Sequence, residues 1–269
     1  MRQRRIIFLL VIILFCLIGC AQVPLSDRKS LRLLPSSQML ALSFQQYDKV
    51  LKESKISRDQ KKVQMVNRVG KRIASAAEAF LKDSGLEREM DNYNWEFNLI
   101  EDDETANAWC MPGGKIAVYT GILKHTRDDT GLAVVLGHEV AHAIARHGNE
   151  RMSQSLLASM GGIALSVALS EKPATTRNLF MVAFGVGTTV GVLLPYSRLH
   201  EYEADRIGLT IMAIAGYDPR KAVSFWERMA AEGGKNRPPS YLSTHPAPES
   251  RIAHIRHYVK EALPYYRKG

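Results

Sequence analysis

The sequence reads LGHEVAHAI from Leu136 to Ile144, and this stretch decides the fold. His138 and His142 lie four residues apart, so on a helix both imidazoles face one side and can reach a single Zn²⁺ at about 2.0–2.1 Å. Glu139 lies one residue round the helix, where its carboxylate can take a proton from a water beside the metal. The small and apolar neighbours favour a buried metal-binding helix over a pair of surface histidines.

Around this motif the sequence predicts more helix than strand. The motif helix is expected to begin at the capping residues 128–130 and to run to residue 148. Apolar residues recur every three or four positions over residues 58–82, which predicts an amphipathic helix, and alternation predicts strands over 94–100 and 115–120. Further helices are expected over residues 150–168, 178–194, 197–215, 218–232 and 248–262. We therefore predict an α+β fold, mostly α, with a small sheet and an active-site helix.

A catalytic zinc normally takes three protein ligands and keeps one position open. Glu201, on the helix expected over 197–215, is a candidate third ligand, and Asp205 lies one turn later on the same face, where it can hydrogen-bond a ligand imidazole. The alternative is a solvated acidic patch that pairs with neighbouring arginines. His147 is a weaker candidate ligand, because it lies round the helix from the first two histidines.

The N-terminus has the pattern of an export signal. Three arginines among the first five residues precede an apolar run over residues 6–18. The sequence LIGC at residues 17–20 resembles a bacterial lipoprotein box, in which cleavage leaves Cys20 to carry the lipid. Two or more acyl chains hold a protein firmly on a bilayer, so we expect a membrane-bound protein.

The predicted organisation follows from this signal: a lipoprotein signal peptide over 1–20, a tether over 21–36 and a zinc-binding domain over 37–269. An uncleaved anchor helix or a plain signal peptide is the alternative for the first segment. Residue 21 is Ala rather than Asp, so the usual signal for retention at an inner membrane is missing. The expected location is a bacterial cell envelope, at the outer membrane facing the periplasm.

Charge and cysteine content exclude other classes of protein. The formal net charge is +9, and removal of residues 1–20 takes away three Arg and no acid, which leaves +6. No stretch combines clustered Lys or Arg with aromatic residues, so we expect no nucleic-acid binding. Of the three cysteines, Cys16 lies in the signal and Cys20 is the lipidation site, which leaves Cys110 without a disulfide partner.

Five segments together resemble the zinc metallopeptidase family that contains HtpX, BepA and the CAAX prenyl proteases, most closely its periplasmic lipoprotein branch. They are GHEVAH at 137–142, SRLHEYEAD at 197–205, THP at 244–246, NAWCMPGGK at 107–115 and YTG at 119–121. The resemblance implies a zincin-like (gluzincin) fold and one zinc per chain, held by His138, His142 and Glu201. It also implies endopeptidase activity on membrane or misfolded envelope proteins.

His245 is the candidate for a donor that steadies the developing oxyanion during peptide hydrolysis. It precedes Pro246, which favours an extended backbone held in a loop. His245 could instead sit on the zinc as a fourth ligand in a resting state, or be a structural histidine in a turn. Arg251 is the alternative donor.

The strand over 115–120 could expose an edge beside the metal helix, where a substrate chain adds as an extra strand. Asn107 and Ala108 are expected near that edge as substrate contacts. The alternative is an ordinary core strand, which gives the substrate no edge.

Residues 155–169 and 179–194 are apolar and rich in glycine, and each is shorter than the roughly 20 residues that a membrane span requires. We expect core helices that close over the site. A lid or a hairpin that dips into the membrane is the alternative.

The predicted function is that of a membrane-anchored zinc endopeptidase in protein quality control, with Glu139 and His245 as its catalytic residues and envelope proteins as substrates. One alternative is a zinc-bearing chaperone or assembly factor that seldom cuts its clients, and another is a metal-free scaffold. The sequence does not indicate an oligomeric state.

Overall fold

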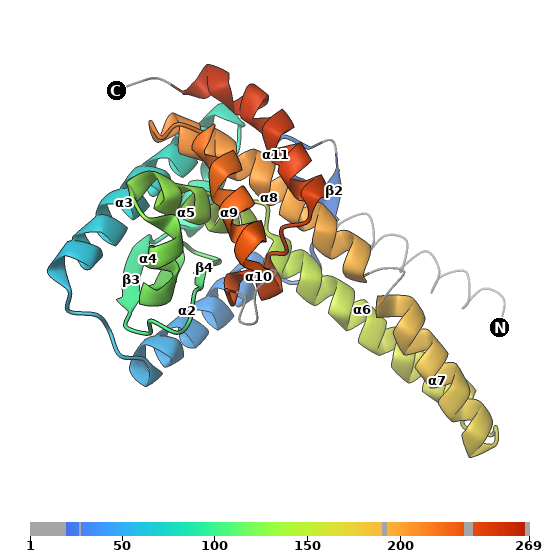
Figure 1. The fold of residues 1–269 in the computed structure, drawn as a ribbon. Helices are drawn as coiled ribbons and strands as arrows, with labels where there is room; N and C mark the ends of the chain where they lie inside the picture. The colour runs from blue at the N-terminus through green and yellow to red at the C-terminus, as the bar shows by residue number, and fades with distance from the viewer. Residues whose placement is uncertain (1–19, 27, 190–192, 234–238, 267–269) are drawn as a thin grey trace. The chain divides into compact units, whose positions relative to one another are not determined.

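The structure is a computed structural model that describes residues 20–26, 28–189, 193–233 and 239–266 (Figure 1). Residues 1–19, which make up nearly all of the expected signal peptide, lie outside the described residues.

Contacts within the chain form two compact units. One unit combines the residues up to Ser36 with His147–Arg198, and the other combines Ser37–Arg146 with Leu199–Gly269. The sequence analysis expected one domain over 37–269, whereas this grouping places residues 147–198 with the N-terminal segment.

The first unit begins with a pair of short strands. β1 (Cys20–Gln22) pairs antiparallel with β2 (Lys29–Leu31), and Val23 in the connection is fully buried. The segment expected to be an irregular tether is therefore partly folded. Strands of three residues are too short to show the alternation by which a strand is predicted from sequence.

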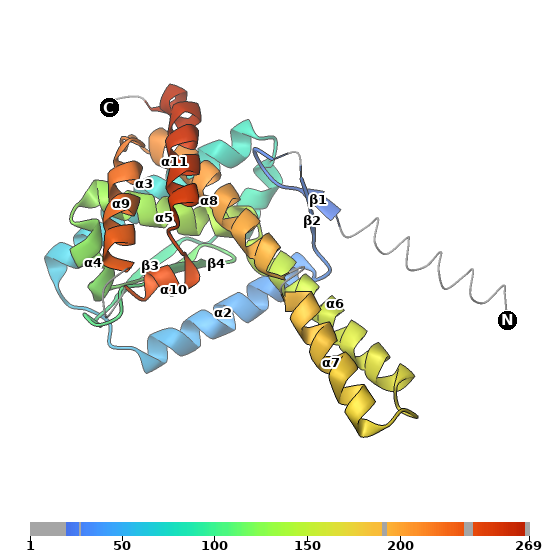
Figure 2. The ribbon, with the colours of Figure 1, turned by 45° about the vertical axis from the view of Figure 1, so that its right-hand side comes forward.

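The same unit contains α6 (His147–Ala168) and α7 (Ala174–Thr188), which lie side by side in Figures 1 and 2. No residue of α7 is buried, and α6 buries only residues near its start. The expectation of core helices over 155–169 and 179–194 is therefore wrong for the described residues, because their apolar side chains face solvent. Among those residues, no helix has both the length and the hydropathy needed to cross a bilayer.

The second unit contains a small sheet and most of the helices (Figure 1). In chain order its elements are α2 (Ser36–Glu53), α3 (Gln60–Asp83), η1 (Glu87–Asn92), β3 (Glu96–Ile100), β4 (Ala108–Met111), β5 (Lys115–Tyr119), α4 (Thr120–Thr126), α5 (Asp129–Ile144), α8 (Leu194–Ile214), α9 (Lys221–Gly233), α10 (Tyr241–Thr244), α11 (Glu249–Ala262) and η3 (Leu263–Tyr265). The predicted mostly helical α+β fold is confirmed.

The sheet has the strand order β3-β5-β4, in which β5 pairs parallel with β3 and antiparallel with β4. The expected edge strand over 115–120 is thus the central strand, and Ile116, Ala117 and Val118 are fully buried. β4, which packs against α5, takes the edge position instead. Gly113 and Gly114, with φ of 87° and 78°, make the turn that joins β4 to β5.

The motif helix α5 lies at the centre of this unit, in contact with α3, α4, α9 and β4. Its start is fixed by Asp128, whose side chain accepts a hydrogen bond from the Gly131 backbone N–H at 2.8 Å. It ends at Ile144, four residues before the expected position, and Arg146 adopts a left-handed φ of 58° that stops the helix before α6. Every residue from Gly131 to Ile144 is buried, so the helix that carries the histidines is held by packing on all sides.

Candidate metal centre

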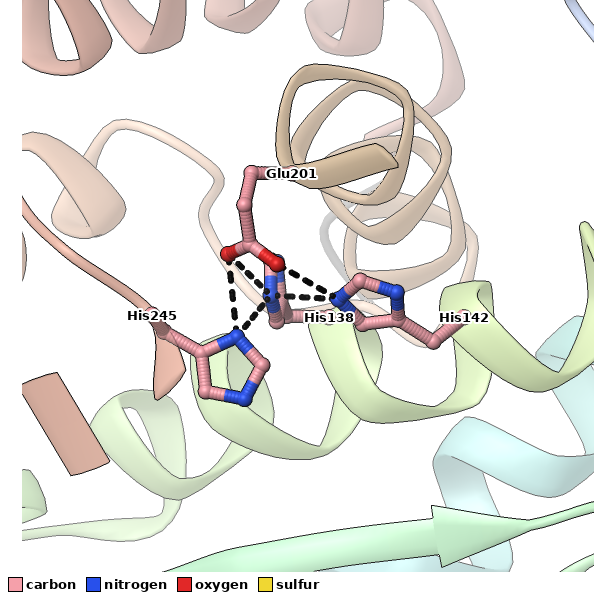
Figure 3. A group of neighbouring side chains, drawn as sticks. All are labelled: His138, His142, Glu201 and His245. Carbon is pink, nitrogen blue, oxygen red and sulfur yellow. Dashed lines mark hydrogen bonds and ion pairs between the residues drawn. The ribbon is translucent and has the colours of Figure 1, made fainter. Parts of the chain in front are cut away.

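His138 and His142 project from the same face of α5, one turn apart (Figure 3). Both side chains are buried, and their Nε2 atoms lie 3.0 Å apart. The geometry of the spacing is as the sequence predicts, since residues four apart on a helix are neighbours. The two imidazoles can therefore share one ion.

Two glycines allow a second helix to approach the motif helix closely. A Cβ atom on Gly137 would lie 2.8 Å from the carbonyl oxygen of Gly208, and a Cβ on Gly208 would lie 2.8 Å from the carbonyl of Gly137. Both contacts are with backbone, which cannot move aside. The absence of side chains at this crossing brings α8, with Glu201 and Asp205, against the histidines.

Glu201 completes a group of ligand atoms on the two helices (Figure 3). Its Oε2 lies 3.4 Å from His138 Nε2, and its Oε1 lies 3.3 Å from His142 Nε2. Ligand atoms held tetrahedrally by one Zn²⁺ at 2.0–2.1 Å lie about 3.3 Å apart. The spacing and the two-imidazole, one-carboxylate chemistry of the group therefore fit a zinc ion, and a solvated acidic patch does not describe this buried carboxylate.

His245 belongs to the same group. It follows α10, and its Nδ1 lies 2.9 Å from Glu201 Oε2 and 3.2 Å from His138 Nε2. One ligand atom from each of the four residues lies within 4.8 Å of the others. His245 therefore stands where a fourth ligand would be, and a structural histidine in a turn does not describe it. His147, the weaker candidate, begins α6 and is not in this group.

Asp205 orients the first histidine. Its Oδ1 lies 2.9 Å from His138 Nδ1, which leaves Nε2 as the ring nitrogen that faces the other ligand atoms. The predicted hydrogen bond between a carboxylate on the second helix and a ligand imidazole is present in the structure.

Arg251 on α11 holds both carboxylates of α8. Its Nε and Nη2 donate to the two oxygens of Asp205 at 2.8 and 2.9 Å, and its Nη1 lies 3.1 Å from Glu201 Oε2. The guanidinium is fully buried and lies 3.7 Å from the centre of the Trp226 ring. The sequence alternative of Arg251 as an oxyanion donor is wrong for this arrangement, because its N–H groups are engaged inside the protein.

These contacts set the charges of the cluster. Burial opposes ionisation of Glu201, but hydrogen bonds from the three histidines hold its pKa well below the ordinary value. Burial likewise opposes ionisation of Asp205, and Arg251 outweighs it and lowers that pKa. Burial alone lowers the pKa of His138, yet its hydrogen bonds to Asp205 and Glu201 raise it to about 9. The cluster therefore favours positive charge at its centre, which a metal cation supplies on displacing protons.

Glu139 is buried beside the ligand group and has two polar neighbours. The Tyr241 hydroxyl donates to its Oε1 at 2.7 Å, and His245 Nε2 lies 3.4 Å from the same oxygen. Burial and the Glu139 carboxylate raise the pKa of Tyr241 well above its usual value, so the hydroxyl keeps its proton and donates. The sequence analysis missed Tyr241, whose only signal is its position four residues before His245.

The predicted substrate contacts lie at the start of the edge strand. Ala108 begins β4 and is buried, and the Asn107 side chain accepts a hydrogen bond from the Ala108 N–H at 2.9 Å. Just before them, the Ala106 carbonyl accepts from the Tyr241 N–H at 2.8 Å. The segment that carries Tyr241 and His245 is thus bonded directly to the approach to this edge.

Comparison with known proteins finds a matching family and named relatives. A family model described as "Peptidase family M48" matches residues 60–259. The mitochondrial metalloendopeptidase OMA1 of Schizosaccharomyces pombe is 40% identical over 174 residues, which cover 64% of this chain and 49% of that protein. OMA1 of Saccharomyces cerevisiae is 34% identical over 199 residues, covering 71% of this chain and 55% of that protein. The β-barrel assembly-enhancing protease of Escherichia coli is 28% identical over 211 residues, covering 75% of this chain and 39% of that protein. The chain thus spans about half the length, or less, of the relatives that it matches.

Proposed function

Because the chain belongs to peptidase family M48, we propose that it is a zinc-dependent endopeptidase that cleaves proteins at a cell-envelope membrane. The observation that carries the proposal is the meeting of ligand atoms from α5 and α8 beside the Glu139 carboxylate. His138, His142 and Glu201 would hold the metal, with one zinc per chain. When bound, zinc polarises the scissile carbonyl and lowers the pKa of a bound water toward about 7.

Glu139 acts as the general base. Its carboxylate takes the proton of the attacking water and later delivers it to the leaving amine. The Tyr241 hydroxyl, 2.7 Å from Glu139 Oε1, fixes the direction of that carboxylate. A carboxylate held in place loses less freedom on reaching the transition state, so Tyr241 supports the reaction without touching the metal.

His245 would be a fourth ligand of the metal in a resting arrangement. Its Nδ1 faces Glu201 and His138, whereas a transition-state donor would have to face the substrate. On this proposal the segment after α10 must move before water and substrate enter. In the alternative, His245 is only a donor to the oxyanion. His245→Ala separates the two roles: activity rises if His245 blocks the site and falls if it is only a donor. His257→Ala, at an exposed histidine of α11, is the control.

The substrate backbone binds along β4. This strand is at an edge of the described sheet and packs against α5, so an added strand would lie beside the metal-binding helix. Asn107 and Ala108 mark the start of that edge. Backbone hydrogen bonds between strands depend little on the side chains of the substrate. We therefore expect broad specificity for extended, unfolded polypeptide.

The protein is anchored by lipid at Cys20 after cleavage before that residue removes the signal peptide, and faces the periplasm from the outer membrane. The support is the lipoprotein box in the sequence. The bacterial relatives are named for β-barrel assembly, whereas the OMA1 relatives are named as mitochondrial. Metabolic labelling with an alkyne fatty acid should mark the wild-type chain and not Cys20→Ser; equal labelling would contradict the anchor.

The central test compares the wild type with Glu139→Gln. Elemental analysis should find about one zinc per chain in both proteins, because Glu139 is not a ligand, while cleavage of unfolded casein should be lost only in the variant. Glu53→Gln, at an exposed carboxylate of α2, is the matched control. Zinc-free wild-type protein, or a Glu139→Gln variant that still cuts, would overturn the proposal. Clearance of client proteins in cells that survives Glu139→Gln would indicate a holding function instead.

A further inference from the structure

The exposed apolar surface of the described chain is concentrated on one hairpin. Ten of the fourteen large hydrophobic side chains that face solvent lie on α6 and α7. On α6, Leu156, Met160, Ile163 and Val167 follow one another at spacings of four, three and four residues, which places them along one face of the helix. Scattered single exposed hydrophobics need no explanation, but a continuous stripe does.

The second helix carries a matching stripe. Leu179, Val182 and Val186 follow at spacings of three and four and are each more than half exposed. The helices are joined to each other through Phe184, whose ring would meet a Cβ placed on Gly161 at 3.0 Å. The two helices form one packed hairpin (Figure 2), and the apolar side chains of both stripes remain exposed on it.

Charge is absent from the body of this hairpin. The eighteen residues from Met152 to Leu169 contain no Asp, Glu, Lys or Arg, and neither do residues 178–189. Between Met152 and Thr189, the charged residues are Glu171, Lys172 and Arg177, at or just after the turn between the helices. A surface made for water would carry charges along its length.

The base of the hairpin is tied to the strands that begin at Cys20. Arg28 makes a two-pronged ion pair with the buried Glu150 of α6, at 2.6 and 2.9 Å. Ser153 on the next turn accepts a hydrogen bond from the Leu33 backbone N–H at 2.9 Å. The residue expected to carry the lipid and the apolar hairpin thus belong to one compact unit.

We propose that the α6–α7 hairpin inserts its exposed apolar stripes into the lipid bilayer to which Cys20 is attached. The inference rests on the proposed lipid anchor, which brings this unit to a membrane surface. The occupant is lipid rather than protein, because the apolar hairpin shares one compact unit with the strand that begins at the lipid-bearing residue. In addition, residues 20–36 and 147–198 contain seven Lys or Arg against three Asp or Glu, which suits an anionic lipid surface.

The test places a fluorescent reporter on the hairpin of the full-length protein. Ile163→Trp and Val182→Trp, each at an exposed position, are reconstituted in vesicles of phosphatidylcholine and phosphatidylglycerol whose acyl chains carry bromine. Bromine quenches tryptophan only on close approach, so residues embedded at the headgroup–acyl boundary should lose about half or more of their added fluorescence. Leu42→Trp, at an exposed apolar position of α2 in the other unit, is the matched control and should lose little.

Two outcomes would overturn the proposal. One is quenching at Ile163→Trp and Val182→Trp no greater than at Leu42→Trp. The other is a blue shift of the hairpin reporters without quenching, which would mean that a second copy or another protein covers the stripes. Intact mass measured on the same preparation reports lipid on Cys20 separately, so a lipidated protein with unquenched reporters leaves the anchor standing and refutes the insertion. If Cys20 carries no lipid, the unlipidated protein is added to the same brominated vesicles. Quenching of the hairpin tryptophans is then measured in the same way.

Discussion

Arg251→Met tests whether the buried guanidinium holds the metal centre together. The variant keeps a side chain of similar length but removes the guanidinium that lies 3.7 Å from the centre of the Trp226 ring. The ion pairs to Asp205 and Glu201 and the hydrogen bond to the Pro246 carbonyl, which are 2.8–3.1 Å long, are lost with it. Removing one partner of a buried ion pair costs about 3–5 kcal/mol of unfolding free energy, because the remaining carboxylates keep their desolvation cost. At about 2–4 °C per kcal/mol for a chain of this size, the melting temperature should fall by about 6–20 °C.

Tryptophan fluorescence is a suitable assay, because Trp95, Trp109 and Trp226, the three tryptophans of the chain, all lie in the unit that carries the site. Melting is followed in chelator, so that zinc binding does not mask the loss of stability. Arg251→Lys should fall between wild type and Arg251→Met, since an ammonium cannot make the two-pronged contact. A melting temperature for Arg251→Met within about 2 °C of the wild type would refute the reasoning.

Three further outcomes are expected. Gly208→Ala should weaken zinc binding about tenfold or more in a chelator competition, because its Cβ would meet the α5 backbone at 2.8 Å, whereas Gly148→Ala, with open space around its Cβ, should change nothing. Tyr241→Phe should lower kcat about tenfold or more with KM nearly unchanged, since a hydrogen bond to the charged general base is lost; an unchanged kcat would contradict the proposed support of Glu139. Cys110 should react with iodoacetamide about tenfold or more slowly than free cysteine at pH 8, and faster as pH rises, because burial and the nearby carboxylate raise its pKa; equal rates would contradict this.

The features of the metal centre that depend on one helix alone can be predicted from the sequence. The spacing of His138 and His142 fixes their common face, and Asp128 marks the start of the helix by a capping bond that follows a known preference. Glu201 has no such signal, because it lies on a different helix from His142. Helical periodicity therefore cannot predict that the two side chains meet. The place of Glu201 depends on the crossing of Gly137 with Gly208, which was not predicted. From the residues alone Glu201 was a candidate beside the alternative of a solvated acidic patch, and the resemblance to a family favoured it as the ligand.

The sheet shows where local pattern fails. The Gly113–Gly114 turn indicates a hairpin between β4 and β5, but the strand β4 was not predicted. The strand over 115–120 was predicted to be an edge strand and is the central one. Nothing in β5 itself says that β3 joins it in parallel through a long connection. That pairing buries both sides of β5 and moves the edge to Ala108–Met111.

The hairpin shows a second kind of failure. Apolar composition over 155–169 and 179–194 favours side chains that leave water, and the error lay in assuming that the protein's own core buries them. Apolar composition indicates that a segment gains free energy by leaving water. The gain is similar whether its side chains enter a protein interior or lipid tails. Only the exposed stripes on the folded helices distinguish the two cases.

The charge balance of the centre argues for a divalent cation in particular. Glu139, Glu201 and Asp205 are buried carboxylates, and Arg251 supplies one positive charge against their three negative charges. An uncompensated buried charge costs several kcal/mol, so the difference of two must be made up by protons on the imidazoles or by a metal. Against the effect of burial, hydrogen bonds to Asp205 and Glu201 raise the pKa of His138, so these carboxylates favour positive charge on the imidazole. One Zn²⁺ would supply both charges at once with the imidazoles neutral, which is why a metal-free scaffold is the less economical account of these residues.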